Sequence, residues 1–203
     1  MAHPTSTVPR LARALITLSV LLLGVAILLV VAAQASPGLR REVASVIGKA
    51  AGSTFEETPE HGYIATGESL ELSDDELPSL ANLDPALLDA TRQAAAAADA
   101  EQGTHLVVTS GWRSPAYQQW LLDQAVARYG SAEEAAKWVS SPEISRHVTG
   151  QAIDIGPFDG TLWMQSNSSR FGLCQIYSNE LWHYELASAH GGSCPPLRES
   201  AAG

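Results

Sequence analysis

The sequence predicts an α+β fold: an N-terminal membrane-spanning helix, then helices packed on a small, mostly antiparallel sheet. Three observations indicate it. A 20-residue apolar run lies near the N-terminus, three helix-start signals occur between residues 84 and 134, and short apolar runs separated by turn residues follow. The chain has 203 residues, which is room for one sizeable core and not comfortably for two.

The apolar run extends from Ala14 to Ala33, and Thr17 and Ser19 are its only polar residues. A helix of that length spans the hydrocarbon core of a bilayer, whereas the apolar region of a signal peptide is usually about 7–15 residues long. We therefore expect residues 1–35 to be a cytoplasmic tip and a single-pass anchor in the cell membrane, with the rest of the chain extracytoplasmic. Ala33-Gln34-Ala35 has the form of a signal-peptidase site, and cleavage after Ala35 would instead make the protein secreted.

The remainder of the chain divides by composition. Residues 36–76 are rich in Gly, Ser, Thr and Pro and contain clustered acids, so we expect an acidic flexible stalk. A folded domain is expected at 77–196 and a C-terminal tail at 197–203. The formal charge is −10, and from Glu42 onward 22 Asp and Glu stand against 8 Lys and Arg. Because nucleic-acid binders carry basic patches, this composition argues against nucleic-acid binding.

Helix signals open the predicted domain. Asp84 is a good N-cap, Pro85 suits the first helical position, and Gly103 marks the end of the helix. Leucines and alanines at helical spacing give this helix a buried face. The apolar run Leu106 to Val108 then predicts a short buried strand that leads into a turn at Ser110-Gly111.

Two more helices are expected before the sheet is completed. Ser114-Pro115 starts one that Gly130 closes. The segment Ser131 to Glu134 has the form of a capping box and starts a short helix reaching about Val139. On the longer of these helices we expect one buried side formed by Trp120, Leu121, Gln124 and Ala125.

The sheet is expected in the last third of the chain. Ala152 to Ile155 alternates as a strand would, Asp159-Gly160 is a turn, and residues 161–171 form a helix. Two further strands are expected at Cys174–Ile176 and Trp182–Leu186.

The two cysteines, Cys174 and Cys194, lie 20 residues apart. In a cytosolic protein they would be free thiols, but in an exported chain a disulfide between them is the natural expectation. It would close a loop of about 20 residues and stabilise the fold by roughly 3 kcal/mol in the chain-entropy model.

Chemistry-bearing residues concentrate between Ser145 and Asp154. His147 and Asp154 are both ordinary zinc-ligand types, and a catalytic zinc needs three protein ligands and one open position. The segment Glu180 to His183 can supply the third ligand and a spare carboxylate. The sequence therefore predicts a zinc hydrolase, with its zinc site on the sheet.

These motifs resemble those of the zinc D-alanyl-D-alanine carboxypeptidase and dipeptidase family. Ser-x-His-x-x-Gly-x-Ala-x-Asp at 145–154 and Glu-x-Trp-His at 180–183 are similar to the family's metal motifs. Upstream, Ser-Gly-Trp-Arg-Ser at 110–114, with Gln118, resembles a third block. The resemblance covers residues 77–186, with Leu181 where the family often has proline and Tyr184 where it often has tryptophan.

The resemblance implies that Zn²⁺ is the cofactor and that His147, Asp154 and His183 hold it. Such a zinc keeps a position for water, whose pKa it lowers toward about 7. Glu180 lies three residues before His183 and would be the catalytic base that takes the water's proton.

The resemblance also places three residues near the substrate: Arg113, Gln118 and Ser145. Arg113 would contact the substrate carbonyl or its terminal carboxylate, because a guanidinium fork suits a carboxylate and a fixed cation stabilises an oxyanion. Ser145 and Gln118 match positions beside the substrate.

The function expected from the sequence is a zinc D,D-carboxypeptidase that removes the terminal D-alanine from peptidoglycan stem peptides ending in D-Ala-D-Ala. Two alternatives stay open. One is a zinc endopeptidase that cuts another peptidoglycan bond, and the other is a non-catalytic zinc domain that binds wall peptide or a partner protein. The presence of Glu180 as an apparent base weighs against the second alternative.

Overall fold

The computed structural model describes residues 55–202. The apolar run at 14–33 and the first part of the expected stalk lie outside these residues. Within the described part of the chain, no helix combines the length and the apolar character needed to cross a membrane.

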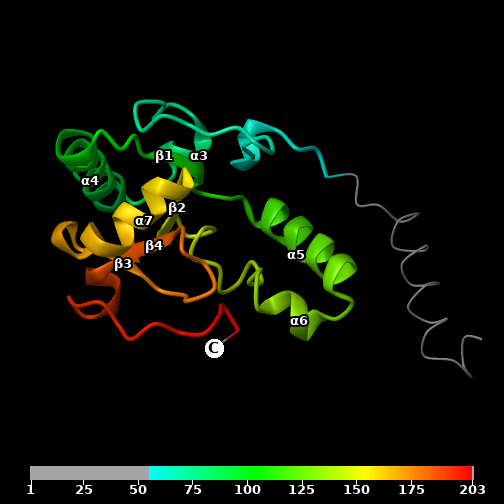
Figure 1. Ribbon diagram of the computed structural model, residues 1–203. Coiled ribbons are helices and arrows are strands. Elements are labelled where there is room, and N and C mark those ends of the chain that lie inside the picture. Colours follow the sequence, from blue (N-terminus) through cyan, green and yellow to red (C-terminus); the bar gives the residue numbers. More distant parts are fainter. Residues whose placement is uncertain (1–54, 203) are drawn as a thin grey trace, which may run out of the picture. The chain divides into compact units, whose positions relative to one another are not determined.

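Four antiparallel strands form the sheet (Figure 1). In spatial order they are β1 (Val107–Ser110), β2 (Ala152–Gly156), β4 (His183–Leu186) and β3 (Leu173–Gln175). The expected small antiparallel sheet with helices packed on it is therefore confirmed. The pairing sets Asp154 directly opposite His183 across β2 and β4.

Three helices begin where their capping signals predict. The Asp84 carboxylate accepts the amide of Ala86 at the start of α4 (Pro85–Gln102). Ser114 caps α5 (Pro115–Tyr129), and Ser131 caps α6 (Ala132–Ala136), which ends three residues before Val139.

The buried side of α5 differs from the one expected. Tyr117, Gln118 and Ala125 are buried, whereas Gln124 is exposed. The reason is that α5 does not cover the sheet but packs beside residues of the expected stalk: the ring of Phe55 stacks on Tyr117 with centroids 5.4 Å apart.

The helix after β2 starts earlier than expected. Asp159-Gly160 is not a separate turn but belongs to the first turn of α7 (Phe158–Asn167), which is followed by the 3₁₀ helix η2 (Ser168–Phe171). A side chain at Gly160 would come within 2.8 Å of a Leu106 methyl carbon. The glycine therefore serves close packing of α7 rather than a turn.

All five residues of β2 are buried, so its expected alternation is wrong in terms of exposure. Ile153 and Ile155 pack into the main core with α4 and α7. Asp154 lies on the opposite face and is covered by the loops of the site. A central strand with both faces covered loses the inside–outside pattern that sequence analysis relies on.

Part of the expected stalk is packed onto the domain. Leu70 forms a bridge with Val108, extending the sheet edge at β1, and Leu72 lies in the main core. Arg92 on α4 donates to the Leu72 carbonyl at 2.9 Å. Residues 70–72 are thus structural elements of the domain, because their leucines bury apolar area that the surrounding acids cannot.

The C-terminal segment is also attached to the domain. A disulfide joins Cys174 on β3 to Cys194, and a parallel bridge pairs Tyr177 with Arg198. Two backbone bonds flank this bridge: Arg198 N donates to Ile176 O at 2.9 Å, and Ser178 N donates to Arg198 O at 2.8 Å. Residues 198–202, expected to be a tail, therefore lie against the domain.

Replacing Leu72 tests the packing of this segment. Leu72→Ala should lower the free energy of unfolding by about 2–3 kcal/mol, because it leaves a cavity in the core. Urea unfolding followed by tryptophan fluorescence measures the change. Leu162→Ala, at a side chain that is 47% exposed, is the control and should stay within about 0.5 kcal/mol of wild type. Equal effects of the two changes would mean that residues 70–72 do not pack as described.

Candidate metal centre and its cleft

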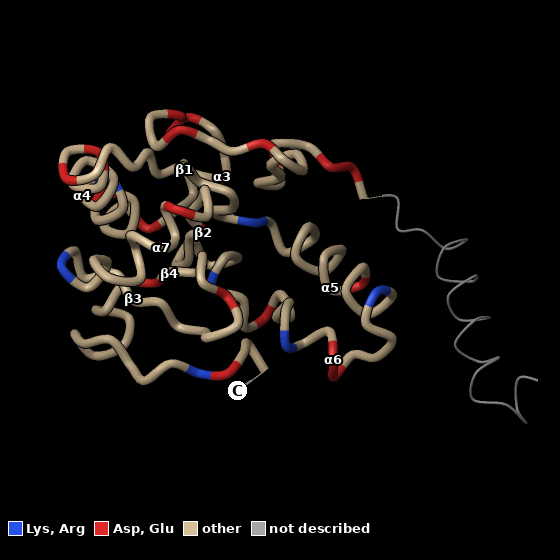
Figure 2. The backbone as a smooth tube through the Cα atoms, viewed as in Figure 1, with Lys and Arg blue, Asp and Glu red and all other residues tan. Residues whose placement is uncertain are grey.

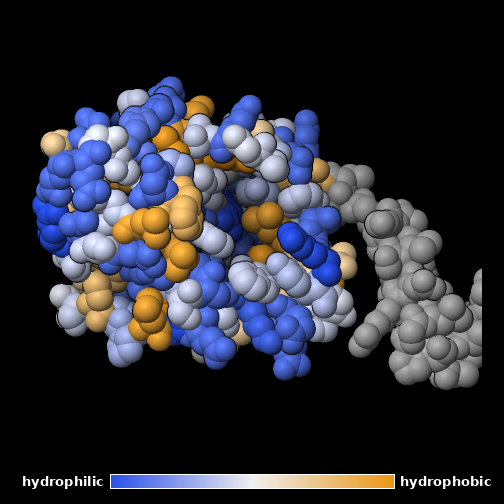
Figure 3. Space-filling model, in the orientation of Figure 1, coloured by the Kyte–Doolittle hydropathy of each residue, from blue (hydrophilic) through white to orange (hydrophobic). Residues whose placement is uncertain are grey.

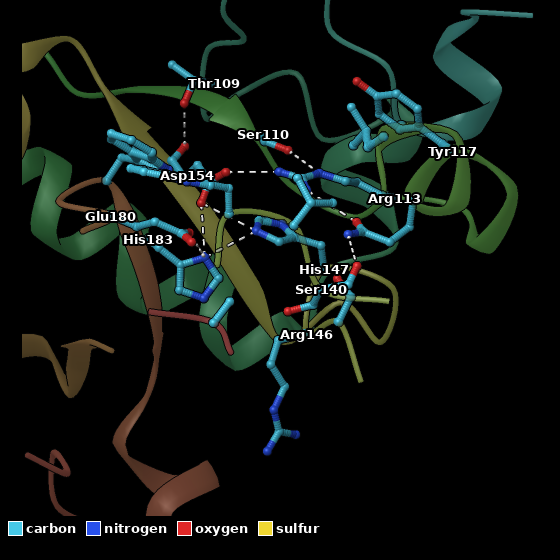
Figure 4. A pocket seen from close by; sticks show the side chains of 18 of the residues that line it. Thr109, Ser110, Arg113, Tyr117, Ser140, Arg146, His147, Asp154, Glu180 and His183 are labelled. Carbon is cyan, nitrogen blue, oxygen red and sulfur yellow. Dashed lines mark hydrogen bonds and ion pairs between the residues drawn. The ribbon is translucent and has the colours of Figure 1, made fainter. Parts of the chain in front are cut away.

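Three ligand-type side chains converge on the sheet: His147, Asp154 and His183 (Figure 4). Asp154 comes from β2 and His183 from β4, where the strand register places them face to face. His147 comes from the loop before β2. Its Nε2 lies 3.2 Å from His183 Nδ1 and 3.4 Å from Asp154 Oδ1, and the latter two atoms are 3.2 Å apart.

The loop that carries His147 is held by backbone contacts to two other segments. Arg113 N donates to His147 O at 3.2 Å, and Asp84 N donates to Gly150 O at 2.8 Å. Gly150 has φ +70°, and a side chain on it would collide with the Asn82 carbonyl. The position therefore requires glycine, as the motif indicated, both for the left-handed backbone and for the close approach.

The hydrogen bonds behind the two imidazoles orient their lone pairs. His147 Nδ1 donates to the carbonyl of Gly111 at 2.8 Å, which leaves Nε2 as the lone-pair atom. His183 Nε2 faces a Glu185 carboxylate oxygen at 3.2 Å, which leaves Nδ1 as the lone-pair atom of the neutral ring. Two imidazole lone pairs and one carboxylate oxygen thus point at a common centre, which is the donor set and the outer-shell support that zinc takes in proteins.

Burial and neighbouring charges shift the pKa values of these groups. Burial would raise the pKa of Asp154, but His147, His183 and Arg113 together hold it well below its usual range. Burial lowers the pKa of His147, and Arg113 adds to the effect. For His183 the opposing burial is outweighed by the bonds to Asp154 and Glu185, which raise its pKa to about 9.

Glu180 lies beside the three ligands without belonging to them. Its Oε2 is 3.8 Å from His183 Nδ1, while Oε1 is buried and has no hydrogen-bond partner among the described residues. Burial raises the pKa of Glu180 to about 7, and Asp154 adds to this, against the lowering effects of His183 and Arg113. A buried, unpartnered carboxyl with a pKa near neutrality is suited to exchange protons with a bound reactant.

Arg113 is held in a fixed orientation by three side chains. Its guanidinium donates to Ser110 at 2.8 Å, to Gln118 at 3.2 Å and to Asp154 at 3.1 Å. Gln118 is almost fully buried and donates in turn to the carbonyl of Ser140 at 2.8 Å. Gln118, which was predicted to lie near the substrate, lines the cavity and also supports Arg113.

All seven predicted site residues line one cavity of about 330 Å³ between the sheet and α5. The molecule is visibly hollowed on this face (Figure 3). Ser145 is 4% exposed at the cavity wall, and Trp138 and Trp182 stand half-exposed at its sides. Ile64 and Ala201 also contribute, although sequence analysis had placed both outside the folded domain.

Sequence analysis missed Glu185, which is 1% exposed. Besides His183, its carboxylate contacts His190 Nε2 at 3.0 Å and lies 3.7 Å from Arg146 Nε. The sequence contains a signal for this role. Residues i and i+2 of a strand share a face, so a glutamate two positions after a ligand histidine lies beside it on the same face. Glu185 lies beyond the Glu-x-Trp-His motif, which ends at His183.

The VanY family model, described as D-alanyl-D-alanine carboxypeptidase, matches residues 80–188 and so includes all seven predicted site residues. The chain belongs to the VanY family. A D-alanyl-D-alanine carboxypeptidase of Enterococcus faecalis is 36% identical, and the match covers 40% of this chain and 40% of that protein. This chain thus spans well under half the length of that relative.

Two solved VanY structures share the fold. One is a zinc complex of a mutant vancomycin-resistance D,D-pentapeptidase VanY from the VanB-type resistance cassette, with TM-score 0.50 and 28% identity over 64% of this chain and 90% of that one. The other is VanYB in complex with D-alanine-D-alanine, with TM-score 0.50 and 29% identity over 64% of this chain and 88% of that one. The sheet and the helices packed on it are therefore shared with these VanY structures, and the His/Asp/His cluster of this chain lies on that sheet.

Removing the carboxylate behind His183 tests how the centre is supported. Glu185→Leu should weaken zinc binding about 10–100-fold, because the ring loses the acceptor that directs its Nδ1 lone pair inward. Competition with a chromophoric chelator measures the affinity. Glu185→Gln keeps an acceptor oxygen and should lose less. Wild-type affinity in a folded Leu variant would show that Glu185 does not orient the ring.

Proposed function

We propose that this protein is a zinc-dependent D,D-carboxypeptidase that removes the terminal D-alanine from peptidoglycan stem peptides. The observation that carries the proposal is the convergence of two imidazole lone pairs and the Asp154 carboxylate beside Glu180, within a VanY-family domain. The VanY relatives solved with zinc and with D-alanine-D-alanine support the choice of metal and substrate.

His147, Asp154 and His183 would hold the zinc ion. When bound there, zinc polarises the scissile carbonyl and makes an attacking water more acidic. Glu180 takes a proton from the water as it attacks the amide carbon. Having gained it, Glu180 passes the proton to the nitrogen of the departing D-alanine, and a pKa near neutrality suits both transfers.

Arg113 supplies a fixed positive charge on the same cavity wall. Its contacts to Ser110, Gln118 and Asp154 restrain the guanidinium before substrate arrives. A restrained guanidinium stabilises either the oxygen that gains charge during attack or the terminal carboxylate that an exopeptidase must recognise. Ser145 would contact the substrate from the cavity wall.

The proposed location is the outer face of the cell membrane. Residues 14–33 would anchor the chain, with a stalk between the anchor and the domain; if the chain is cleaved after Ala35, the protein would be secreted. The disulfide between Cys174 and Cys194 supports an oxidising compartment. Peptidoglycan is the peptide substrate available there.

The activity is tested by incubating the zinc-loaded protein with a pentapeptide ending in D-Ala-D-Ala and measuring free D-alanine. Release should occur, and a chelator should abolish it. Glu180→Gln should lower kcat by at least about 10³-fold with zinc still bound, because the variant lacks the proton acceptor. Glu133→Gln, on exposed α6, is the matched control. Cleavage elsewhere in the peptide, seen by mass spectrometry, would favour the endopeptidase alternative.

The pH profile tests the role of Glu180 separately. Only the ionised carboxylate can accept a proton, so kcat/KM should rise with pH as Glu180 loses its proton. The pKa of about 7 applies without a metal, and a bound cation lowers it, so the rise should lie at or below about pH 7. Steady-state rates between pH 5 and 8 give the profile. A fall of kcat/KM with rising pH across that range would contradict the assignment of Glu180 as base.

A further inference from the structure

A second cavity, of about 460 Å³, adjoins the metal cleft. Ser145, Arg146 and Tyr177 line both cavities, so the two share a wall. The far side of the second cavity is formed by Arg198 and His190, which are not part of the metal cleft. The two cavities are therefore direct neighbours on either side of Ser145 and Arg146.

Three of the seven Lys and Arg in the described residues line these two cavities. Residues 55–202 contain seven Lys and Arg and 21 Asp and Glu. Figure 2 shows that the acids are spread over the segment before α4, over α4 itself and over α6. Four of the seven are engaged elsewhere. Three of these pair with carboxylates, namely Arg92, Lys137 and Arg170. The fourth, Arg128, lies over an aromatic ring. The remaining three line the cavities: Arg113, Arg146 and Arg198.

Arg146 has donors to spare on the side of the second cavity. Figure 4 shows its side chain extending away from His147 and Arg113. One guanidinium nitrogen donates to Gln151, and Nε lies 3.7 Å from Glu185, while the side chain is 41% exposed. A guanidinium carries five N–H donors, so most of them stay available to a ligand.

Arg198 faces the same space from the chain end. Its backbone is bonded to Ile176 and Ser178, and the disulfide at Cys194 closes the loop that returns it to the domain. Arg198 is exposed to solvent. These backbone contacts hold the base of its long side chain, while the guanidinium at the tip is free to move. Two acids also line the cavity. The carboxylate of Glu185 is paired with its histidine and arginine neighbours. Glu143 is exposed to solvent.

We propose that the second cavity is an anion subsite that binds a free carboxylate of the substrate on the N-terminal side of the scissile bond. The inference rests on the proposed function. With the terminal D-alanine near Arg113, the peptide crosses the metal ligands toward Arg146, because the two arginines lie on different sides of His147. The substrate class is then a D-Ala-D-Ala peptide that carries a second, internal carboxylate.

Two probes that differ only in this charge test the subsite. One is acetyl-L-Ala-D-Glu-Lys(acetyl)-D-Ala-D-Ala, with the glutamate linked through its side chain so that its α-carboxylate is free. The other has D-isoglutamine at the same position and is neutral there. Binding is measured by calorimetry to the full-length, zinc-loaded Glu180→Gln protein, which holds the peptides without turnover.

The acidic peptide should bind about tenfold more tightly than the neutral one, the usual gain from a charge-assisted hydrogen bond. In an Arg198→Gln background this preference should fall to less than about threefold, and Arg198→Lys should keep part of it. Arg128→Gln removes a charge remote from the cavity and should leave the preference unchanged. Raising the salt to 0.5 M should reduce the preference, by screening.

The same peptides separate this proposal from the proposed function. Release of D-alanine from both peptides with equal kcat/KM and equal binding would leave the carboxypeptidase standing and overturn the subsite. A preference that depends on Arg198, without D-alanine release by the wild-type protein, would support the subsite and overturn the carboxypeptidase. A preference that survives Arg198→Gln and Arg146→Gln together would place the carboxylate elsewhere and overturn the subsite.

Discussion

The register between β2 and β4 is the constraint on which the centre depends. It sets Asp154 opposite His183, so that two of the three ligand-type side chains meet across neighbouring strands. A slip of one residue would turn one of them to the opposite face of the sheet. Ile153 and Tyr184, also paired and fully buried, hold the register by packing, because the same slip would expel them from the core.

The third ligand depends on a different kind of contact. His147 lies on a loop, where no strand ladder fixes it, and two backbone hydrogen bonds and one bond from the imidazole of His147 take over that role. They tie the loop to the segments at Gly111, Arg113 and Asp84. The two motif segments at 110–114 and 145–150 are thus one structural unit. Their contact positions both the metal ligand and the guanidinium that faces it.

Local chemistry explains which elements were predictable. The starts of α4, α5 and α6 depend on a side chain bonding its own helix a few residues on, and such contacts are visible in the sequence. The exposure of β2, the buried side of α5 and the packing of Leu70 and Leu72 depend on neighbours remote in the chain. A pattern of apolar and polar residues cannot show how many faces of an element are covered.

The sequence by itself determined the candidate ligands, the adjacent glutamate and arginine, and the family, because their chemistry needs particular residue types at particular spacings. Only the tertiary structure decided which nitrogen of each imidazole faces the centre, since the Gly111 carbonyl and the Glu185 carboxylate select it through contacts that no motif specifies. It also brought Arg198 to the cavity beside Arg146, 52 positions earlier in the chain. Such proximity depends on the disulfide and on backbone pairing between distant segments, and composition and periodicity carry no record of either.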